Sequence, residues 1–156
     1  MLIAIRFIYL FSLVIWIGSI LFFSFFAAPS IFKVLPRETA GEVVGDIFPK
    51  YWMIGYISGI VSILSVIIIY IKEKGNYTAI ISVLAIMTIL TFYSGMAVGQ
   101  KARAIKAEIK ITEDASKKEG LKKEFSTVHR KSAILNGIIL ALGIILIFLT
   151  ASSMRV

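Results

Sequence analysis

A chain of 156 residues that is 58% hydrophobic, with a mean hydropathy of +0.91, is long enough for one domain and too apolar for an ordinary soluble fold. Its net charge of +8 comes from 17 Lys and Arg against 9 Asp and Glu, and it has no cysteine. The lack of cysteine excludes disulfides, thiolate nucleophiles, iron–sulfur clusters and Cys-based metal sites.

Four long apolar stretches fill most of the chain, at about residues 7–32, 52–71, 77–100 and 132–152. Every Asp, Glu, Lys and Arg and the single His lie between or outside these stretches. A helix of about 20 apolar residues can cross a bilayer, and a helix satisfies its own backbone hydrogen bonds. The first stretch is too long for the core of a signal peptide. The sequence therefore predicts an all-α integral membrane protein, a single domain over residues 1–156 that folds as a bundle of four transmembrane helices.

Basic residues concentrate in two of the connections, which predicts the orientation in the membrane. The connections at 33–51 and 101–131 hold thirteen Lys and Arg, whereas the other side of the bundle holds four: Arg6, Lys72, Lys74 and Arg155. By the positive-inside rule, both basic connections face the cytoplasm and both termini lie outside the cell membrane. A basic loop beside the lipid bilayer favours anionic lipid headgroups as partners over nucleic acid.

Both basic connections are predicted to be structured. Residues 37–48 have the pattern of an amphipathic helix at the membrane interface, and Pro49 is expected to begin the next helix. In the longer connection, a seam of apolar side chains predicts a helical hairpin that extends spans three and four, with a disordered loop as the alternative. Ser116 and Glu119 suit a capping box at the start of its second arm. The seam consists of Ile105, Ile109, Leu121, Phe125 and Val128.

Two glycine pairs have the spacing that lets helix backbones approach closely. Gly55 and Gly59 lie in the second span, and Gly95 and Gly99 lie in the third. Such pairs serve either the packing of helices within one bundle or the face of a homodimer. The spacing is compatible with both.

His129, Ser132 and Asn136 are the most informative polar residues. Their spacing of three and then four residues places them on one face of a helix that runs from the cytoplasmic interface into the fourth span. An amide at the depth of Asn136 is expected to face another helix rather than lipid. This face either fixes the helix register by hydrogen bonds or lines a ligand cavity at the cytoplasmic mouth of the bundle.

An acidic row, Glu38, Glu42 and Asp46, recurs every four residues before the second span. A solvated helix face explains the row. If the row approached His129, the four side chains together would suit a divalent metal ion. The spans contain no ionisable Asp, Glu, Lys, Arg or His, which argues against a proton relay. No Ser-His-Asp order, Gly-rich phosphate loop or zinc spacing is present, so no catalytic residue is predicted.

Three blocks of the sequence resemble one known family. Residues 16–32, Trp-Ile-Gly-Ser-Ile-Leu-Phe-Phe-Ser-Phe-Phe-Ala-Ala-Pro-Ser-Ile-Phe, resemble the start of the family typified by transmembrane protein 205, which carries a domain of unknown function. Leu35-Pro36-Arg37-Glu38, Ala40-Gly41 and Phe48-Pro49-Lys50-Tyr51 are similar to its Leu-Pro-Arg…Gly…Phe-Pro-x-Tyr signature. His129…Ser132…Asn136 resembles its His-x-x-Ser-x-x-x-Asn pattern. The resemblance implies the four-helix plan, supplies no reaction or cofactor, and suggests as site residues Pro36, Phe48, Pro49, Tyr51, His129 and Asn136.

Three classes of function remain open from the sequence. The first is the binding or transport of a small solute or metal ion at the cytoplasmic mouth. Its candidate ligand-binding residues are His129, Ser132, Asn136, Tyr51, Phe48 and Pro49. The second class is a haem- or redox-associated membrane enzyme, for which a single His would need a partner chain. The third is a membrane assembly factor without a ligand. The sequence identifies no cofactor.

Overall fold

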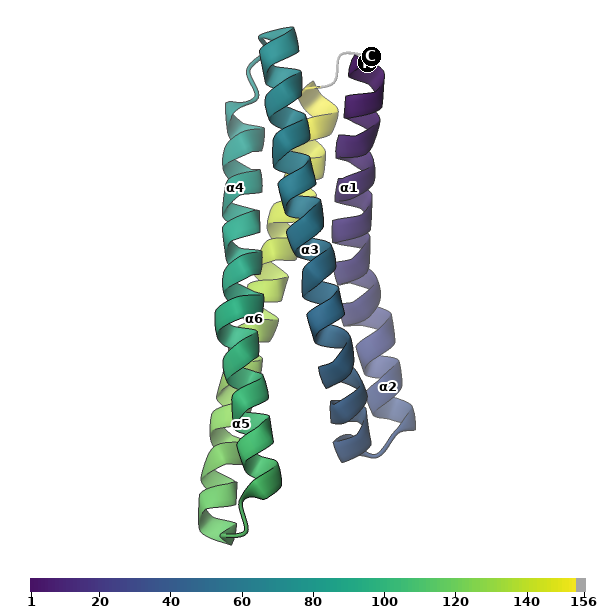
Figure 1. Ribbon diagram of the computed structural model, residues 1–156. Coiled ribbons are helices and arrows are strands. Elements are labelled where there is room, and N and C mark those ends of the chain that lie inside the picture. The colour runs from purple at the N-terminus through teal and green to yellow at the C-terminus, as the bar shows by residue number, and fades with distance from the viewer. Residues whose placement is uncertain (154–156) are drawn as a thin grey trace.

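The computed structural model describes residues 1–153 and consists of four long helical rods (Figure 1). Each rod is long and apolar enough to cross a membrane, so the prediction of an all-α protein with four spans is confirmed. Arg155, counted above with the charges of the terminal side, lies outside the described residues. The rods are, in chain order, α1 (Leu2–Phe22) with η1 (Phe23–Ala27) and α2 (Ala28–Val34); α3 (Arg37–Glu73); α4 (Thr78–Phe92) with η2 (Tyr93–Val98) and α5 (Gly99–Ile111); and α6 (Ala115–Ser153).

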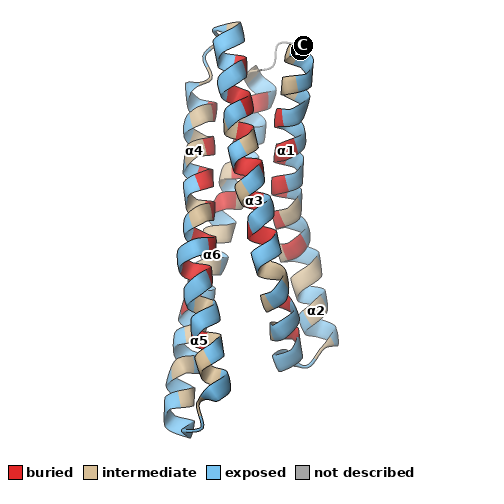
Figure 2. Ribbon diagram, in the orientation of Figure 1, coloured by how far each residue is buried: buried red, intermediate tan, exposed pale blue. Residues whose placement is uncertain are grey.

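Buried residues lie where the rods face one another (Figure 2), and they include serines and threonines as well as apolar side chains. Trp16, Leu84, Met87 and Leu146 are fully buried where the rods meet, while large apolar side chains cover the outside. Only 28–39% of the residues in the most apolar window of each rod are buried. An outer surface this apolar would aggregate in water and is suited to lipid.

Polar side chains inside the bundle hydrogen-bond between rods. Ser12 Oγ on α1 lies 2.7 Å from Ser62 Oγ on α3, and Tyr9 Oη lies 2.7 Å from Thr150 Oγ1 on α6. Buried hydroxyls in lipid need such partners, and each pair contributes about 0.6 kcal/mol or somewhat more. The bonds join α1 to both of the long rods beside it.

The helix predicted at residues 37–48 is present, but its predicted end before Pro49 is corrected. Pro49 lies inside α3, which continues without interruption from Arg37 to Glu73. Proline lacks an N–H, and its ring crowds the carbonyl of the residue four places earlier. That residue is Gly45, and helices of membrane bundles tolerate proline when neighbours support them. Residues 37–48 therefore continue the course of the span and do not form a separate surface helix.

The predicted hairpin beyond spans three and four is confirmed. Ile105 and Val128 are buried, and Ile109, Leu121 and Phe125 pack against them between α5 and α6. The start of α6 differs from the prediction, because Asp114 Oδ1 accepts hydrogen bonds from the backbone N–H groups of residues 116 and 117, at 2.8 and 3.0 Å. Asp114 is therefore the N-cap, and the capping box at Ser116 is corrected.

The two glycine pairs are buried against side chains of the same chain. A Cβ on Gly55 or Gly59 would lie 2.8 Å from Thr91 Cγ2 and Thr88 Oγ1 respectively. A Cβ on Gly99 would lie 2.1 Å from Cη2 of Trp52. The missing side chains thus let α3 approach α4, η2 and α5, and in this arrangement the glycine faces serve packing within the bundle.

Two turns of π-helix, η1 and η2, interrupt the first and third rods. The backbone N–H of Ala28 donates to the Phe23 carbonyl and that of Gly99 donates to the Ser94 carbonyl, each five residues back. Pro29 follows η1 and cannot donate a backbone hydrogen bond to Phe25, which favours the wider turn there. Such turns place one extra residue in a helix and occur at functional sites.

Candidate functional site

A cavity of about 340 Å³ lies where α1 and η1 approach α3, η2 and α6. Ligand pockets in proteins are commonly of about 300–1,000 Å³ and mostly apolar, with a few convergent polar groups. Five of the six ligand-binding candidates predicted from the sequence line this cavity, although they come from α3 and α6, far apart in the chain. The lining residues are Ile20, Phe23, Ser24, Phe25, Ala28, Phe48, Tyr51, Trp52, Ser94, His129, Ser132, Ala133, Asn136, Gly137 and Leu140.

A hydrogen-bonded chain of three side chains crosses the cavity wall. The Tyr51 hydroxyl on α3 donates to Asn136 Oδ1 on α6 at 2.5 Å. Asn136 Nδ2 in turn donates to Ser24 Oγ on η1 at 3.0 Å. An amide offers two N–H donors and two lone pairs, so Asn136 keeps one donor and one lone pair beyond these bonds. The chain fixes the relative positions of three rods and leaves hydrogen-bonding capacity at the cavity.

Aromatic rings form the apolar part of the wall. Phe48 stacks on Trp52 with ring centroids 5.1 Å apart, and Phe23 approaches the edge of Phe48 at 5.2 Å. Phe23 also lies 5.3 Å from the ring of Tyr51. Offset and edge-to-face contacts of this kind contribute about 0.5–1.5 kcal/mol each beyond their buried area. The four rings make a rigid apolar surface next to the Tyr51–Asn136 hydrogen bond.

His129 and Ser132 lie on the cavity wall toward the basic end of α6. The imidazole of His129 stacks on Phe125 at 6.1 Å and its side chain is exposed. The spacing of three and four residues therefore places His129, Ser132 and Asn136 along one wall, from an exposed edge to a half-buried amide. Pro49 and Pro36 do not line the cavity.

A second, small pocket lies deeper in the bundle and shares part of its wall with the cavity. It holds about 10 Å³, room for about one water, between Trp16, Gly55 and Thr91. Asn136 and Ser94 line both the small pocket and the main cavity. Polar groups therefore reach from the main cavity toward the buried centre of the bundle.

The acidic row does not join His129. Glu42 accepts a hydrogen bond from Lys110 Nζ at 2.5 Å, and Asp46 forms an ion pair with Lys50 at 2.8 Å. The Lys110 ammonium holds the pKa of Glu42 below its ordinary value, and Glu42 raises that of Lys110. Within residues 1–153, no three His, Asp or Glu side chains come together as they would to hold a metal ion.

The other end of the bundle is joined by charged and polar contacts. The guanidinium of Arg6 on α1 donates to Glu73 Oε1 on α3 through Nε at 3.0 Å and Nη2 at 2.7 Å. The hydroxyl of Tyr77, in the turn after α3, donates to Glu73 Oε2 at 2.5 Å. The space beside these residues is about 20 Å³. The two ends of the bundle therefore differ, with the large cavity near the basic end.

Ser24 and Phe23 belong to the site but were not predicted. Ser24 is a polar residue between phenylalanines in the first span, which is a detectable signal. In a span that is apolar on every side, however, sequence spacing does not indicate which face meets the other helices. The π-turn that carries these residues also shifts the helical period, which a pattern of 3.6 residues per turn does not anticipate.

Comparison with known proteins gives a family but no activity. A protein of Aquifex aeolicus (strain VF5), named "Uncharacterized protein", is 50% identical over 48 residues, which are 31% of this chain. The chain spans about a third, 35%, of the length of that relative. No solved structure matches the chain. Residues 11–110 match a family described as a domain of unknown function, DUF4149.

The matched region contains two of the three sequence blocks discussed above, at 16–32 and 35–51, and ends before His129. It carries a different family name from the one suggested by those blocks, and like that family it is described as a domain of unknown function. Because the match covers well over half of the residues, the chain belongs to the DUF4149 family.

Proposed function

We propose that this membrane protein binds a small, uncharged solute in the cavity between η1, α3 and α6. The observation that carries the proposal is the convergence of Tyr51, Asn136 and Ser24 on one aromatic-walled cavity of about 340 Å³. Rigid rings supply apolar contact, and the remaining amide N–H and lone pair of Asn136 can orient one polar group of a ligand.

The chemistry of the wall favours a neutral ligand. Among the lining residues, Asp, Glu, Lys and Arg are absent, and His129 lies at the exposed edge. A fully charged solute would lose its hydration without gaining a countercharge in the interior of the cavity. The wall also offers no carboxylate to a metal ion, because Glu42 and Asp46 do not line the cavity and are paired with lysines. An aromatic or amphiphilic alcohol, phenol or amide fits both the rings and the amide.

The mouth of the cavity is assigned to the cytoplasmic side of the cell membrane, with both termini outside. The support is the excess of Lys and Arg in the two connections at that end of the bundle. A reporter fused at Gly120 is expected to behave as cytoplasmic. Activity of an enzyme reporter that works only outside the cytoplasm would reverse the orientation.

Transport of the solute is the second candidate function. It is supported by the asymmetry of the bundle, in which a large cavity near one end contrasts with the Arg6–Glu73–Tyr77 contacts at the other. A carrier needs one end accessible while the other is closed, and the reverse arrangement in a second state. The redox enzyme and the assembly factor proposed from the sequence have no comparable support from the geometry.

Filling the cavity is the direct test, and Gly137 is suited to it. A Cβ on Gly137 would meet no heavy atom within 4 Å, and Gly137 lines the cavity. Gly137→Leu should therefore fill the space without disturbing the backbone. Gly18→Leu is the matched control, because a Cβ on Gly18 also has no neighbour within 4 Å, but Gly18 does not line this cavity.

The probe is 1-naphthol, a small aromatic alcohol, titrated calorimetrically into the protein in detergent micelles, with empty micelles as the blank. The wild type and Gly18→Leu should bind it with one-to-one stoichiometry, and Gly137→Leu should lose binding about tenfold or more. Equal binding by all three proteins would refute the cavity as the site. Native mass spectrometry and visible absorbance of the purified protein then separate a retained solute from a haem.

A further inference from the structure

A second, strongly basic groove lies between α3 and α5, apart from the cavity described above. It is a shallow, open groove of about 480 Å³, lined by Arg103, Lys106 and Lys110 from α5, with Glu42 and Gly45 from α3. The three cations recur at intervals of three and four residues, so they share one face of α5. Glu42 is the one carboxylate among the lining residues, and the more distant charge of Glu38 also helps to raise the pKa of Lys110. The groove therefore keeps a net positive charge.

Two of these cations lack an acidic partner, in contrast to three other lysines of the hairpin. Lys101, Lys117 and Lys123 each form an ion pair with a glutamate of the same hairpin. Within residues 1–153, no carboxylate lies within 4.0 Å of the charged groups of Arg103 or Lys106. The hairpin therefore neutralises these three lysines, whereas the charges of Arg103 and Lys106 stay in the groove without a carboxylate at close range.

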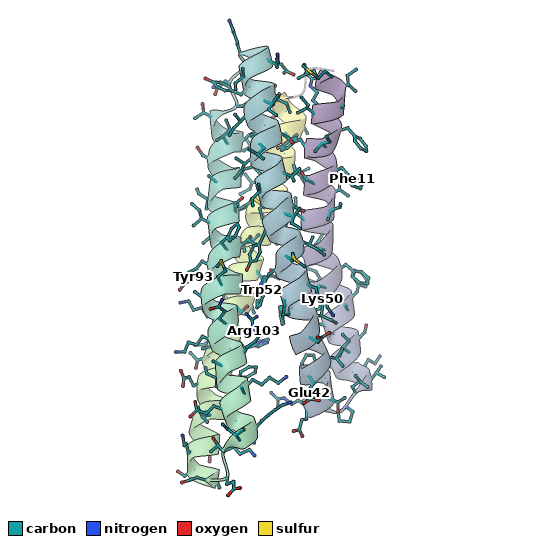
Figure 3. The ribbon with its side chains drawn as sticks, viewed as in Figure 1. Phe11, Glu42, Lys50, Trp52, Tyr93 and Arg103 are labelled. Carbon is teal, nitrogen blue, oxygen red and sulfur yellow. The ribbon has the colours of Figure 1, made fainter. Side chains whose placement is uncertain are left out.

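Local contacts hold the two unpaired cations in place. The Arg103 guanidinium lies 5.4 Å from the centroid of the Trp52 ring, and Figure 3 shows both side chains in the gap between α3 and α5. Lys106 Nζ donates to the Gly41 carbonyl at 2.7 Å and would lie 3.3 Å from a Cβ on Gly45. The glycine pair Gly41 and Gly45 thus makes room for the ammonium group. Preordered cations lose less conformational entropy when they bind an anion.

Along the bundle axis, the groove lies at the level where the headgroup of a bilayer lipid is expected, just beyond the apolar stretch. Arg103 lies three residues beyond the end of the apolar stretch 77–100, about 4.5 Å along the helix. Deeper in the bundle, the stacked rings of Tyr56 and Phe92, 4.4 Å between centroids, join α3 to α4. Phe92 lies eight residues before the end of that stretch, about 12 Å along the helix. An anion bound at Arg103 and Lys106 could therefore carry acyl chains that continue along an apolar surface.

We infer that the groove between α3 and α5 binds the phosphate headgroup of an anionic phospholipid. The Arg103 guanidinium offers a fork of donors to two phosphate oxygens, and Lys106 supplies a second charge-assisted bond. Lys110 can exchange Glu42 for the same phosphate. This site is distinct from the solute cavity and does not depend on it.

The test compares phosphatidylglycerol with phosphatidylcholine of the same acyl chains, by native mass spectrometry of the protein released from detergent. Wild-type protein should retain one phosphatidylglycerol about tenfold more strongly than phosphatidylcholine. The double variant Arg103→Gln, Lys106→Gln should lose this preference. The matched control is Lys118→Gln, Lys122→Gln, which removes the same charge from positions of the same hairpin that do not line the groove and should keep the preference within about twofold.

A third variant is expected to bind phosphatidylglycerol more tightly than the wild type. Glu42→Gln removes the only carboxylate of the groove and frees Lys110, so phosphatidylglycerol should bind about threefold more tightly. A defect in folding would not produce tighter binding. Equal losses in the two double variants would show unspecific attraction to a basic hairpin and overturn the inference. So would weaker binding by Glu42→Gln, or displacement of the lipid by inorganic phosphate at equal concentration.

Discussion

Replacing Gly99 by alanine tests the packing that positions the cavity wall. A Cβ on Gly99 would lie 2.1 Å from Cη2 and 2.4 Å from Cζ3 of Trp52, whereas non-bonded carbons prefer about 3.5–4.0 Å. The indole would therefore have to move by about 1.5 Å. It has little freedom to do so, because it is buried and contacts Phe48 and Arg103.

The expected cost follows from two opposing terms. Overpacking of this kind costs about 1–3 kcal/mol, and the higher helix propensity of alanine over glycine offsets about 1 kcal/mol. Because the obstacle is a rigid ring, Gly99→Ala should lower the free energy of unfolding by about 1–2 kcal/mol. Gly137→Ala is the matched control, since it gains the same propensity without a contact within 4 Å and should be stabilised by up to about 1 kcal/mol.

The assay is unfolding in mixed detergent micelles, followed by far-ultraviolet circular dichroism, in a double-mutant cycle with Trp52→Ala. In the Trp52→Ala background the obstacle is gone, so Gly99→Ala should become neutral or favourable, with a coupling energy of about 2 kcal/mol. If Gly99→Ala stabilises the otherwise unchanged protein as much as Gly137→Ala does, Trp52 does not pack on Gly99 and the reasoning fails.

The same unfolding assay checks three other variants. Tyr51→Phe should cost about 1 kcal/mol, because Asn136 loses a hydrogen-bond donor, and unchanged stability would contradict that bond. Arg6→Gln should cost about 1 kcal/mol or less, as for other partly exposed ion pairs, and a larger loss would indicate that the pair is more buried than described. Hydrogen bonds, first from Tyr77 and then from Arg6, hold the pKa of Glu73 below its ordinary value, so its stabilisation is present at higher pH and is lost as the pH falls through the lowered pKa. Glu73→Gln should therefore flatten the loss of stability on acidification, and an unchanged acid profile would refute this assignment.

The four rods and the hairpin between α5 and α6 could be predicted because each rests on a local pattern. Charge-free apolar length fixes a span, and the spacing from Ile105 to Val128 fixes the seam of the hairpin. The rule that a proline ends or begins a helix failed at Pro49, because the effect of this proline depends on Gly45 and on the surrounding bundle. A preference that holds for isolated helices was overridden by tertiary packing.

The candidate site was only partly predictable for a related reason. His129, Ser132 and Asn136 stand out because they are polar residues with helical spacing in an apolar segment, and the motif around Phe48 and Tyr51 added α3. Which helix faces Asn136 depends on the packing of three rods, and so the contribution of η1 was missed. The basic groove was hidden for another reason, because a row of lysines and arginines does not indicate which of them have acidic partners.

At the two π-turns, the chain can lose or gain a single residue beside the cavity. Each turn carries one residue more than an α-helical turn of the same rise, so it can release that residue without breaking the rod. Deleting Phe25 from η1 would therefore restore an ordinary α-helical turn and keep α1 and α2 in register. Only the residues of the turn itself would change place, and three of them, Phe23, Ser24 and Phe25, line the cavity. Single-residue insertions and deletions at these two points are therefore a route by which sequences of the same family could reshape the cavity while keeping the four spans intact.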